Sequence, residues 1–144
     1  MFNITILTGF LLSLSSTVIA GNLSVEVFLG ADQRPLSVNE AGRVGVVTIY
    51  DLSEPEQIEE RISQSLSNNP QQAQKQAQKM LEQNGQTIVR EFSAAYQGVL
   101  KASEYKLKKL PAIVFNHGES VVYGELNIIK AIHIYTNTKA GGHR

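Results

Sequence analysis

The sequence predicts an α/β domain in which a mixed sheet of about four strands is covered by helices and ends in a hairpin and a helix. Short apolar runs typical of strands stand on both sides of a long segment with a helical repeat. The last two runs flank a short turn and precede another helical segment. Strands on both sides of a helical block favour a sheet with helices packed on its faces.

The first two strands come before the helical block. In Leu23–Leu29, Val25 and Val27 alternate with other residues, which predicts a strand, and residues 30–43 are rich in turn formers and predict a loop. Val44–Leu52 is more densely apolar and predicts an inner strand covered on both faces. A parallel crossover normally takes about a dozen residues or more, so this connection leaves the relative direction of the two strands open.

A first helix begins at Ser53, since Glu56 stands three residues later at the spacing of a capping box. Its apolar stripe recurs at four-residue steps and consists of Ile58, Ile62 and Leu66.

A second helix begins at Asn69, a capping residue, and Pro70, which suits the first turn, and continues to about Ala102. Residues 83–85 contain a glycine and predict a break or a kink, and the glutamine-rich residues 71–83 predict a solvated face. The apolar side of this helix is expected to consist of Ala73, Ala77, Leu81, Ile88, Phe92, Ala95, Tyr96 and Val99.

The C-terminal third predicts an antiparallel hairpin and a helix. Ala112–Phe115 and Ser120–Tyr123 are strand-like and flank turn residues, and Glu125–Thr136 has a helical repeat. We expect residues 21–138 to form one domain and residues 139–144 a loose tail. One side of the last helix is expected to hold Leu126, Ile129, Ile132 and His133.

Residues 1–20 are typical of a secretory signal peptide, with an uncharged apolar centre and a cleavage site after Ala20. No lysine or arginine precedes the apolar run, and the first basic residue is Arg34. A retained membrane anchor and a buried N-terminal helix or strand are the alternatives. Cleavage and export predict a periplasmic domain that is not held in the membrane.

Composition excludes several function classes. The 13 basic and 13 acidic side chains balance, so there is no basic excess of the kind that draws a protein to nucleic acid or to a membrane surface. The chain has no cysteine, which excludes disulfides, thiol nucleophiles and thiolate metal sites.

The remaining chemical side chains form no recognisable catalytic or metal motif. His117, His133 and His143 lack the pairwise spacing of metal ligands. Ser120 stands near His117 and Asp51 is distant in sequence, but no Gly-x-Ser-x-Gly motif is present. We therefore predict no catalytic, cofactor-binding or metal-binding residue, and no cofactor.

Two groups of charged residues stand out. The acidic residues Glu59, Glu60 and Glu91 are expected on exposed helix faces. The lysine cluster is expected on a solvated loop, or else, if its members share a face, on a surface for an acidic partner or nucleic acid: Lys101, Lys106, Lys108 and Lys109.

The closing hairpin and helix, together with Leu110–Val114, resemble a thioredoxin-like domain. In that fold a cis-proline directly precedes a strand, and Pro111 is the matching position. The resemblance implies a reduced thioredoxin-like scaffold. Thiol–disulfide exchange needs a thiolate, so a redox role is excluded and a binding role is expected.

Four segments resemble a family of small exported proteins encoded in the transfer regions of integrating conjugative elements: Val25–Phe28, Tyr50–Leu52, Ala95–Val99 and Val121–Glu125. The match extends over nearly the whole chain after residue 20 and departs from the family at Lys106–Leu110, where the family tends to have Gly-Val-Thr-Lys-Ile. More distantly, the chain is similar to thioredoxin-like pilus-assembly proteins of F-type conjugation systems.

This resemblance implies a non-catalytic periplasmic component of a conjugative type IV secretion system, whose partners are other conjugation or secretion proteins of the envelope. The alternative is a free-standing periplasmic enzyme or small-ligand binder with a pocket near Pro111 and His117. For Tyr96 and Tyr123, a packing role and a binding role both stay open. The candidate structural or interaction residues are Pro111, Tyr96, Gly98, Tyr123, Gly124 and Glu125.

Overall fold

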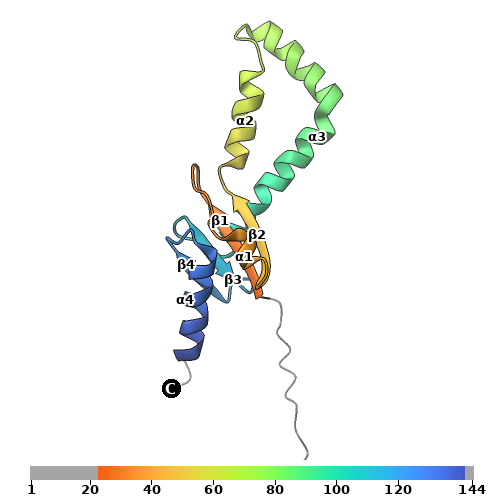
Figure 1. Ribbon diagram of the computed structural model, residues 1–144. Helices are drawn as coiled ribbons and strands as arrows, with labels where there is room; N and C mark the ends of the chain where they lie inside the picture. Colours follow the sequence, from red (N-terminus) through yellow and green to blue (C-terminus); the bar gives the residue numbers. More distant parts are fainter. Residues whose placement is uncertain (1–22, 142–144) are drawn as a thin grey trace, which may run out of the picture.

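The computed structural model describes residues 23–141. Four strands form one sheet in the order β2-β1-β3-β4 (Figure 1). The predicted signal peptide and its cleavage site lie outside the described residues. The elements are β1 Leu23–Leu29, α1 Val38–Ala41, β2 Gly45–Asp51, α2 Glu54–Gln64, α3 Pro70–Glu104, β3 Ala112–Phe115, β4 Ser120–Tyr123 and α4 Ile128–Gly141.

The sheet is mixed, as expected. β1 and β2 are parallel, which settles the direction that the sequence left open, whereas β3 runs antiparallel to β1 and β4 antiparallel to β3. The predicted C-terminal hairpin is therefore confirmed. The peptide bond between Leu110 and Pro111, directly before β3, is cis, as the resemblance implied.

Each face of the sheet carries its own apolar core. Alternation along β1 directs Val25 and Val27 to the face covered by α1 and α4, where the ring of Phe115 stacks on that of Tyr135 with centroids 4.5 Å apart. On the opposite face, Phe28 is fully buried and packs in a cluster with the end of α3 and the segment that follows it.

β2 is an edge strand, so the prediction of an inner strand covered on both faces is wrong. It pairs only with β1 among the described residues. Val46 is 59% exposed and Ile49 is 41% exposed. An apolar run alone does not distinguish a central strand from an edge strand, because that depends on which segments pair beside it.

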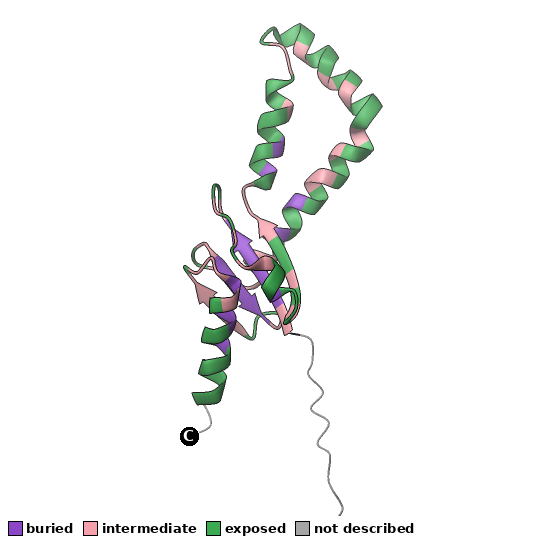
Figure 2. Cartoon of the chain, in the orientation of Figure 1, coloured by how far each residue is buried: buried purple, intermediate pink, exposed green. Residues whose placement is uncertain are grey.

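The helices α2 and α3 form an arm that extends away from the sheet (Figure 1). Residues 83–85 were expected to break or kink the helix. α3 is continuous over 35 residues, so there is no break, but its axis bends midway in Figure 1, as a kink would make it. The buried residues of the arm, among them Ala95 and Gly98, lie near its base (Figure 2). Leu81 and Tyr96, expected on the packed side, are 61% and 42% exposed. No described helix is long and apolar enough to cross a membrane.

The predicted capping box does not form at Ser53. The Ser53 hydroxyl donates to Asp51 Oδ1 at 2.5 Å, and Gln57 Nε2 donates to the Ser53 hydroxyl at 2.8 Å. Asp51 also accepts the backbone N–H of Ser53 at 2.9 Å. The Asp51 carboxylate, which stands two residues before Ser53 at the end of β2, thus takes the place that the sequence pattern gave to Glu56.

The last helix is shifted relative to its prediction. Leu36, in the predicted loop, accepts from Ile128 and donates to the carbonyl of Leu126, so residues 126–127 pair with it before the helix begins. α4 then continues to Gly141, into the predicted tail. His133 is exposed, and Tyr135 is buried in its place. The predicted loop also contains the short helix α1.

Candidate functional site

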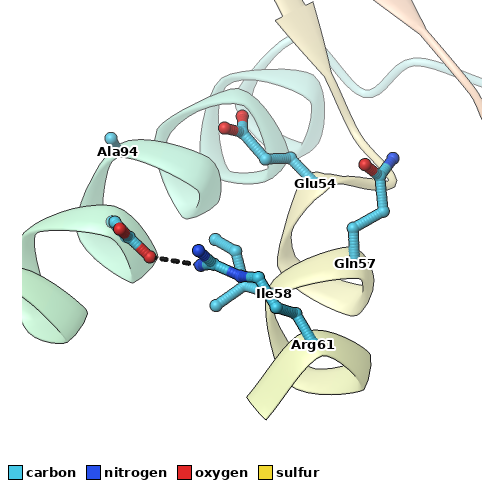
Figure 3. Close-up of a pocket in the computed structure, with 6 residues that line it drawn as sticks. Glu54, Gln57, Ile58, Arg61 and Ala94 are labelled. Atoms are coloured by element: carbon cyan, nitrogen blue, oxygen red, sulfur yellow. Dashed lines mark hydrogen bonds and ion pairs between the residues drawn. The ribbon is translucent and has the colours of Figure 1, made fainter. Parts of the chain in front are cut away.

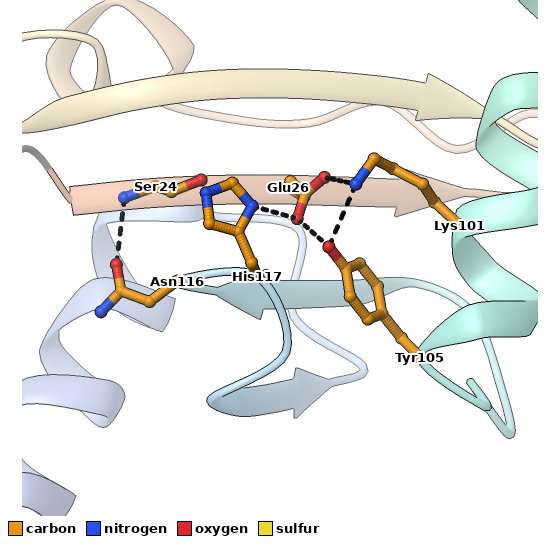
Figure 4. Close-up of polar contacts among 6 residues, drawn as sticks. All are labelled: Ser24, Glu26, Lys101, Tyr105, Asn116 and His117. Atoms are coloured by element: carbon orange, nitrogen blue, oxygen red, sulfur yellow. Dashed lines mark hydrogen bonds and ion pairs between the residues drawn. The ribbon is translucent and has the colours of Figure 1, made fainter.

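A buried carboxylate lies between the sheet and the end of α3. β1 places Glu26 on the same face as Phe28, where it is only 4% exposed. Tyr105 Oη donates to Glu26 Oε2 at 2.6 Å, and Lys101 Nζ lies 3.1 Å from Glu26 Oε1 (Figure 4). Tyr105 stands four positions after Lys101, so both project from one side of the helix end. His117 Nδ1 lies 3.7 Å from Glu26 Oε2 and completes the cluster.

The cluster favours the protonated forms of its donors. Burial, and then the hydrogen bond to Glu26, raise the pKa of the Tyr105 hydroxyl. The hydrogen bonds to Tyr105 and then to Glu26 raise the pKa of the Lys101 ammonium. A lysine or tyrosine acts as a nucleophile or base only after it loses its proton. The geometry therefore fits a clamp between α3 and β1.

Sequence reasoning missed Glu26 and Tyr105. The available signal was an acidic residue inside the apolar run of β1, because a carboxylate on a buried strand needs a partner. The four lysines predicted as one cluster do not share one site. Lys101 joins Glu26, whereas Lys106, Lys108 and Lys109 line a separate hollow together with Leu110.

A second polar cluster joins the hairpin turn to α4. Asn116 Nδ2 donates to Glu119 Oε2 and to the hydroxyl of Tyr135, both at 2.8 Å. Tyr135 donates in turn to Glu119 at 3.0 Å, and Lys139 pairs with the same carboxylate. Lys139, followed by Asn116 and Tyr135, lowers the pKa of Glu119 to about 2. Asn116 also accepts the backbone N–H of Ser24 at 3.2 Å, which ties β1 to this turn (Figure 4).

Four of the predicted residues lie close together at the end of the hairpin. The backbone N–H of Gly124, with φ of +77°, donates to the carbonyl of Pro111 at 2.9 Å. The ring of Tyr123 lies 5.7 Å from Lys109 Nζ. Glu125 accepts the N–H of Asn127 at 2.9 Å, just before α4, and its pKa is lowered by Lys130 and then by that N–H. These contacts join β3, β4 and the start of α4.

The other two predicted residues lie on opposite sides of α3. A Cβ on Gly98 would lie 2.8 Å from the Cβ of Tyr50 and 3.1 Å from Leu52 Cδ2, so the glycine permits close packing of the helix on β2. Tyr96 is 42% exposed and stacks on Phe92, with ring centroids 6.3 Å apart. The structure thus does not bring all six predicted residues into one site.

A hollow lies between α2 and α3 at the base of the arm, and its wall includes Glu54, Gln57, Ile58 and Ala94 (Figure 3). An ion pair between Arg61 and Glu91 crosses it. Glu91, expected on an exposed helix face, is half-buried and paired with Arg61. A separate hollow farther along the arm has a mostly apolar wall, which includes Ile62, Leu66, Ala77, Met80, Leu81, Ile88 and Phe92.

A family model of proteins of unknown function, DUF1525, matches residues 24–140. The chain belongs to this family. The match begins in β1 and ends in α4, so it includes the sheet, the arm and both polar clusters. No curated protein and no solved structure matches the chain.

The elements of a hydrolase or a metal site are not assembled among residues 23–141. His117 faces Glu26, and Asp51 accepts from Ser53, so no described hydrogen bond links either residue to Ser120. That part of the chain also holds no group of three potential metal ligands. Neither Pro111 nor His117 lines the lysine-rich hollow beside Leu110.

Proposed function

We propose that this chain is a non-catalytic accessory component of the conjugative type IV secretion system of an integrating conjugative element. It acts in the periplasm by binding another transfer protein. The four matching segments and the apolar residues 1–20 support this proposal. We also propose a reduced thioredoxin-like scaffold, which the strand order and the C-terminal hairpin and helix support.

The observation that carries a binding role is an apolar stripe on α3, in which Val89 and Tyr96 are exposed and the other members are half-buried. Gly85, Val89, Phe92, Tyr96 and Val99 recur at alternating steps of four and three residues. This is the spacing with which one helix packs along another. None of the charged residues on this stretch of the helix belongs to the repeat.

The stripe faces away from the sheet. Tyr96 stands two residues before Gly98, the sheet contact, and therefore lies about half a turn away from it around the helix. Val89 is 64% exposed, and Leu100, beside the repeat, is 67% exposed. Exposed apolar residues that follow one another along a helix mark an interaction surface more often than scattered ones do. The occupant that fits is the apolar side of an amphipathic helix of another transfer protein.

The test places charge on the stripe in the host element. Val89→Lys combined with Leu100→Lys is expected to lower the conjugation frequency at least about tenfold, because a desolvated lysine opposes helix packing. Gln83→Lys combined with Gln97→Lys adds the same charge to exposed positions of α3 outside the stripe and should leave transfer unchanged. Thermal unfolding of each purified variant checks that the fold is retained.

Two results would count against the proposal. Undiminished transfer by the stripe variant would show that the stripe is not needed for function. Undiminished transfer after a clean deletion of the gene would show that the chain has no role in conjugation. Export has its own test: residues 1–20 fused to alkaline phosphatase should give activity outside the cytoplasm. A reporter that stays inactive in the cytoplasm would contradict the periplasmic assignment.

A further inference from the structure

The outer edge of β2 is open and unprotected. Its seven residues pair without interruption with β1, and nothing among residues 23–141 pairs with its other side. The strand contains no proline, lysine or bulge, which are devices that prevent pairing at an edge, and its one charged residue, Asp51, stands at its end. The opposite edge, β4, is only four residues long. The sheet thus presents one long edge that is ready to accept a strand.

Apolar side chains surround this edge. Val44, Val46 and Ile49 are 53%, 59% and 41% exposed. Val46 lies on the face that α3 covers, and Ile49 lies on the face of α1 and α4, so both sides of the edge carry exposed apolar surface. An added strand would bury both surfaces and would satisfy the free backbone groups of β2.

We propose that β2 pairs antiparallel with β2 of a second copy of this chain, around a two-fold axis at Thr48. Thr48 is the central residue of the strand, so this register overlaps all seven residues. It places Val46 opposite the partner's Tyr50, and Val47 opposite the partner's Ile49. Aromatic and β-branched cross-strand pairs of this kind stabilise sheets, and so do threonine pairs such as Thr48 with the partner's Thr48.

Charge also fits this register. Asp51 is opposite the partner's Gly45, so the two carboxylates at the strand ends do not face each other. Arg43, two residues before β2, comes to the end of the partner's strand where Asp51 lies. Both contacts occur twice because the interface is two-fold symmetric.

The part of β2 that α3 covers in one copy also complements the part that is uncovered in the other copy. α3 approaches β2 at Tyr50, through Gly98, whereas Val46 at the other end of the strand is uncovered. Antiparallel pairing sets the uncovered Val46 of one copy beside the covered Tyr50 of the other. This register therefore favours a second copy as the partner. An unrelated strand would need its own covering element at the position opposite Val46.

A cysteine scan tests both the pairing and its register, because the chain has no native cysteine. Directly opposed residues of an antiparallel pair have Cα atoms about 4.5–5.5 Å apart, within the range of about 4.4–6.8 Å that a disulfide spans. Thr48→Cys in the exported protein should give a disulfide-linked dimer under mild oxidation. Val46→Cys places its two copies four positions apart, about 13 Å along the strands, and should not cross-link. Gln97→Cys, exposed on α3, is the control for random collision.

A charge exchange at the same position tests the interface without cross-linking. The wild-type protein should have dimer mass by light scattering, and Thr48→Lys and Thr48→Glu alone should each have monomer mass, because like charges then face each other. An equimolar mixture of the two variants should regain dimer mass. The stripe variant, Val89→Lys combined with Leu100→Lys, should remain a dimer, which separates this interface from the proposed α3 surface.

Several outcomes overturn the inference: a monomeric wild-type protein, a Thr48→Lys variant that stays dimeric, or equal cross-linking at positions 46, 48 and 97. A monomer whose β2 edge is occupied by a strand of another protein would also overturn it.

Discussion

Glu26 shows how one residue can join two elements. An ionised carboxylate is costly to bury unless charged or hydrogen-bonding partners replace water. Tyr105 and Lys101 provide such partners from the end of α3, which otherwise contacts the sheet through apolar packing. The contact therefore helps to fix the arm on the sheet.

Removal of the carboxylate should destabilise the fold. Glu26→Ala is expected to lower the free energy of unfolding by about 2 kcal/mol, since Tyr105 loses its buried acceptor while Lys101 retains access to water. Tyr105→Phe should cost about 1 kcal/mol, and the double variant should cost less than the sum because the two residues interact. Urea unfolding measures all three. Exposed Glu104→Ala is the control, and strictly additive effects would contradict the clamp.

Alkaline pH should weaken the same contact. The pKa of Tyr105 is raised above its ordinary value of 10.0, so the folded state retains a proton that the unfolded state loses. The stabilisation is fully present below about pH 10 and is lost as pH rises through the folded pKa. The difference in unfolding free energy between the wild type and Tyr105→Phe should therefore shrink as the pH rises above about 10. A difference that is constant or growing over this range would contradict the assignment.

At the scale of elements, α3 carries two glycines in opposite settings. Gly98 lies against Tyr50, whereas a Cβ on Gly85 would meet nothing within 4 Å. Both positions are interior to the helix, so helix propensity favours alanine at each by about 1 kcal/mol. Only the packing differs, which makes the pair a matched comparison.

The two glycines should respond with opposite signs. Gly98→Ala is expected to destabilise the protein by about 1–3 kcal/mol, because its Cβ would overlap Tyr50. Gly85→Ala should stabilise it by up to about 1 kcal/mol. Urea unfolding followed by circular dichroism reports both changes. Equal stabilisation by the two substitutions would show that α3 does not pack closely on β2.

At the scale of the molecule, stability is distributed unevenly. β3 is buried along its whole length, whereas the arm beyond its base is exposed or half-buried (Figure 2). Segments with few buried apolar contacts open at lower free energy than a core does.

Hydrogen exchange should show this difference. Amide protons of the outer arm, from about residue 66 to residue 85, should exchange more than about tenfold faster than those of β1 and β3. Mass spectrometry of proteolytic fragments resolves the two regions. Binding of a partner helix to the α3 stripe should slow exchange in the arm. Equal protection of the arm and the sheet in the isolated protein would contradict this distribution.

Sequence by itself determined the local structure. Alternation in Leu23–Leu29 and the turn between two apolar runs predicted β1 and the hairpin correctly, since both patterns depend on neighbours in the chain. It also supplied the residues that the resemblance marks, of which Gly98 and Gly124 occupy positions where a close approach or a positive φ favours glycine. The export signal remains a sequence prediction.

Only the tertiary structure decided how these pieces meet. It made β2 an edge strand, because no other described segment pairs beside it. It brought Glu26 to Tyr105, which stands 79 positions away in sequence, and it placed Tyr96 away from the core. Periodicity reports which residues share one side of an element, but not which sides are covered. Coverage depends on contacts between distant segments, and both proposed interaction surfaces arise where it is missing.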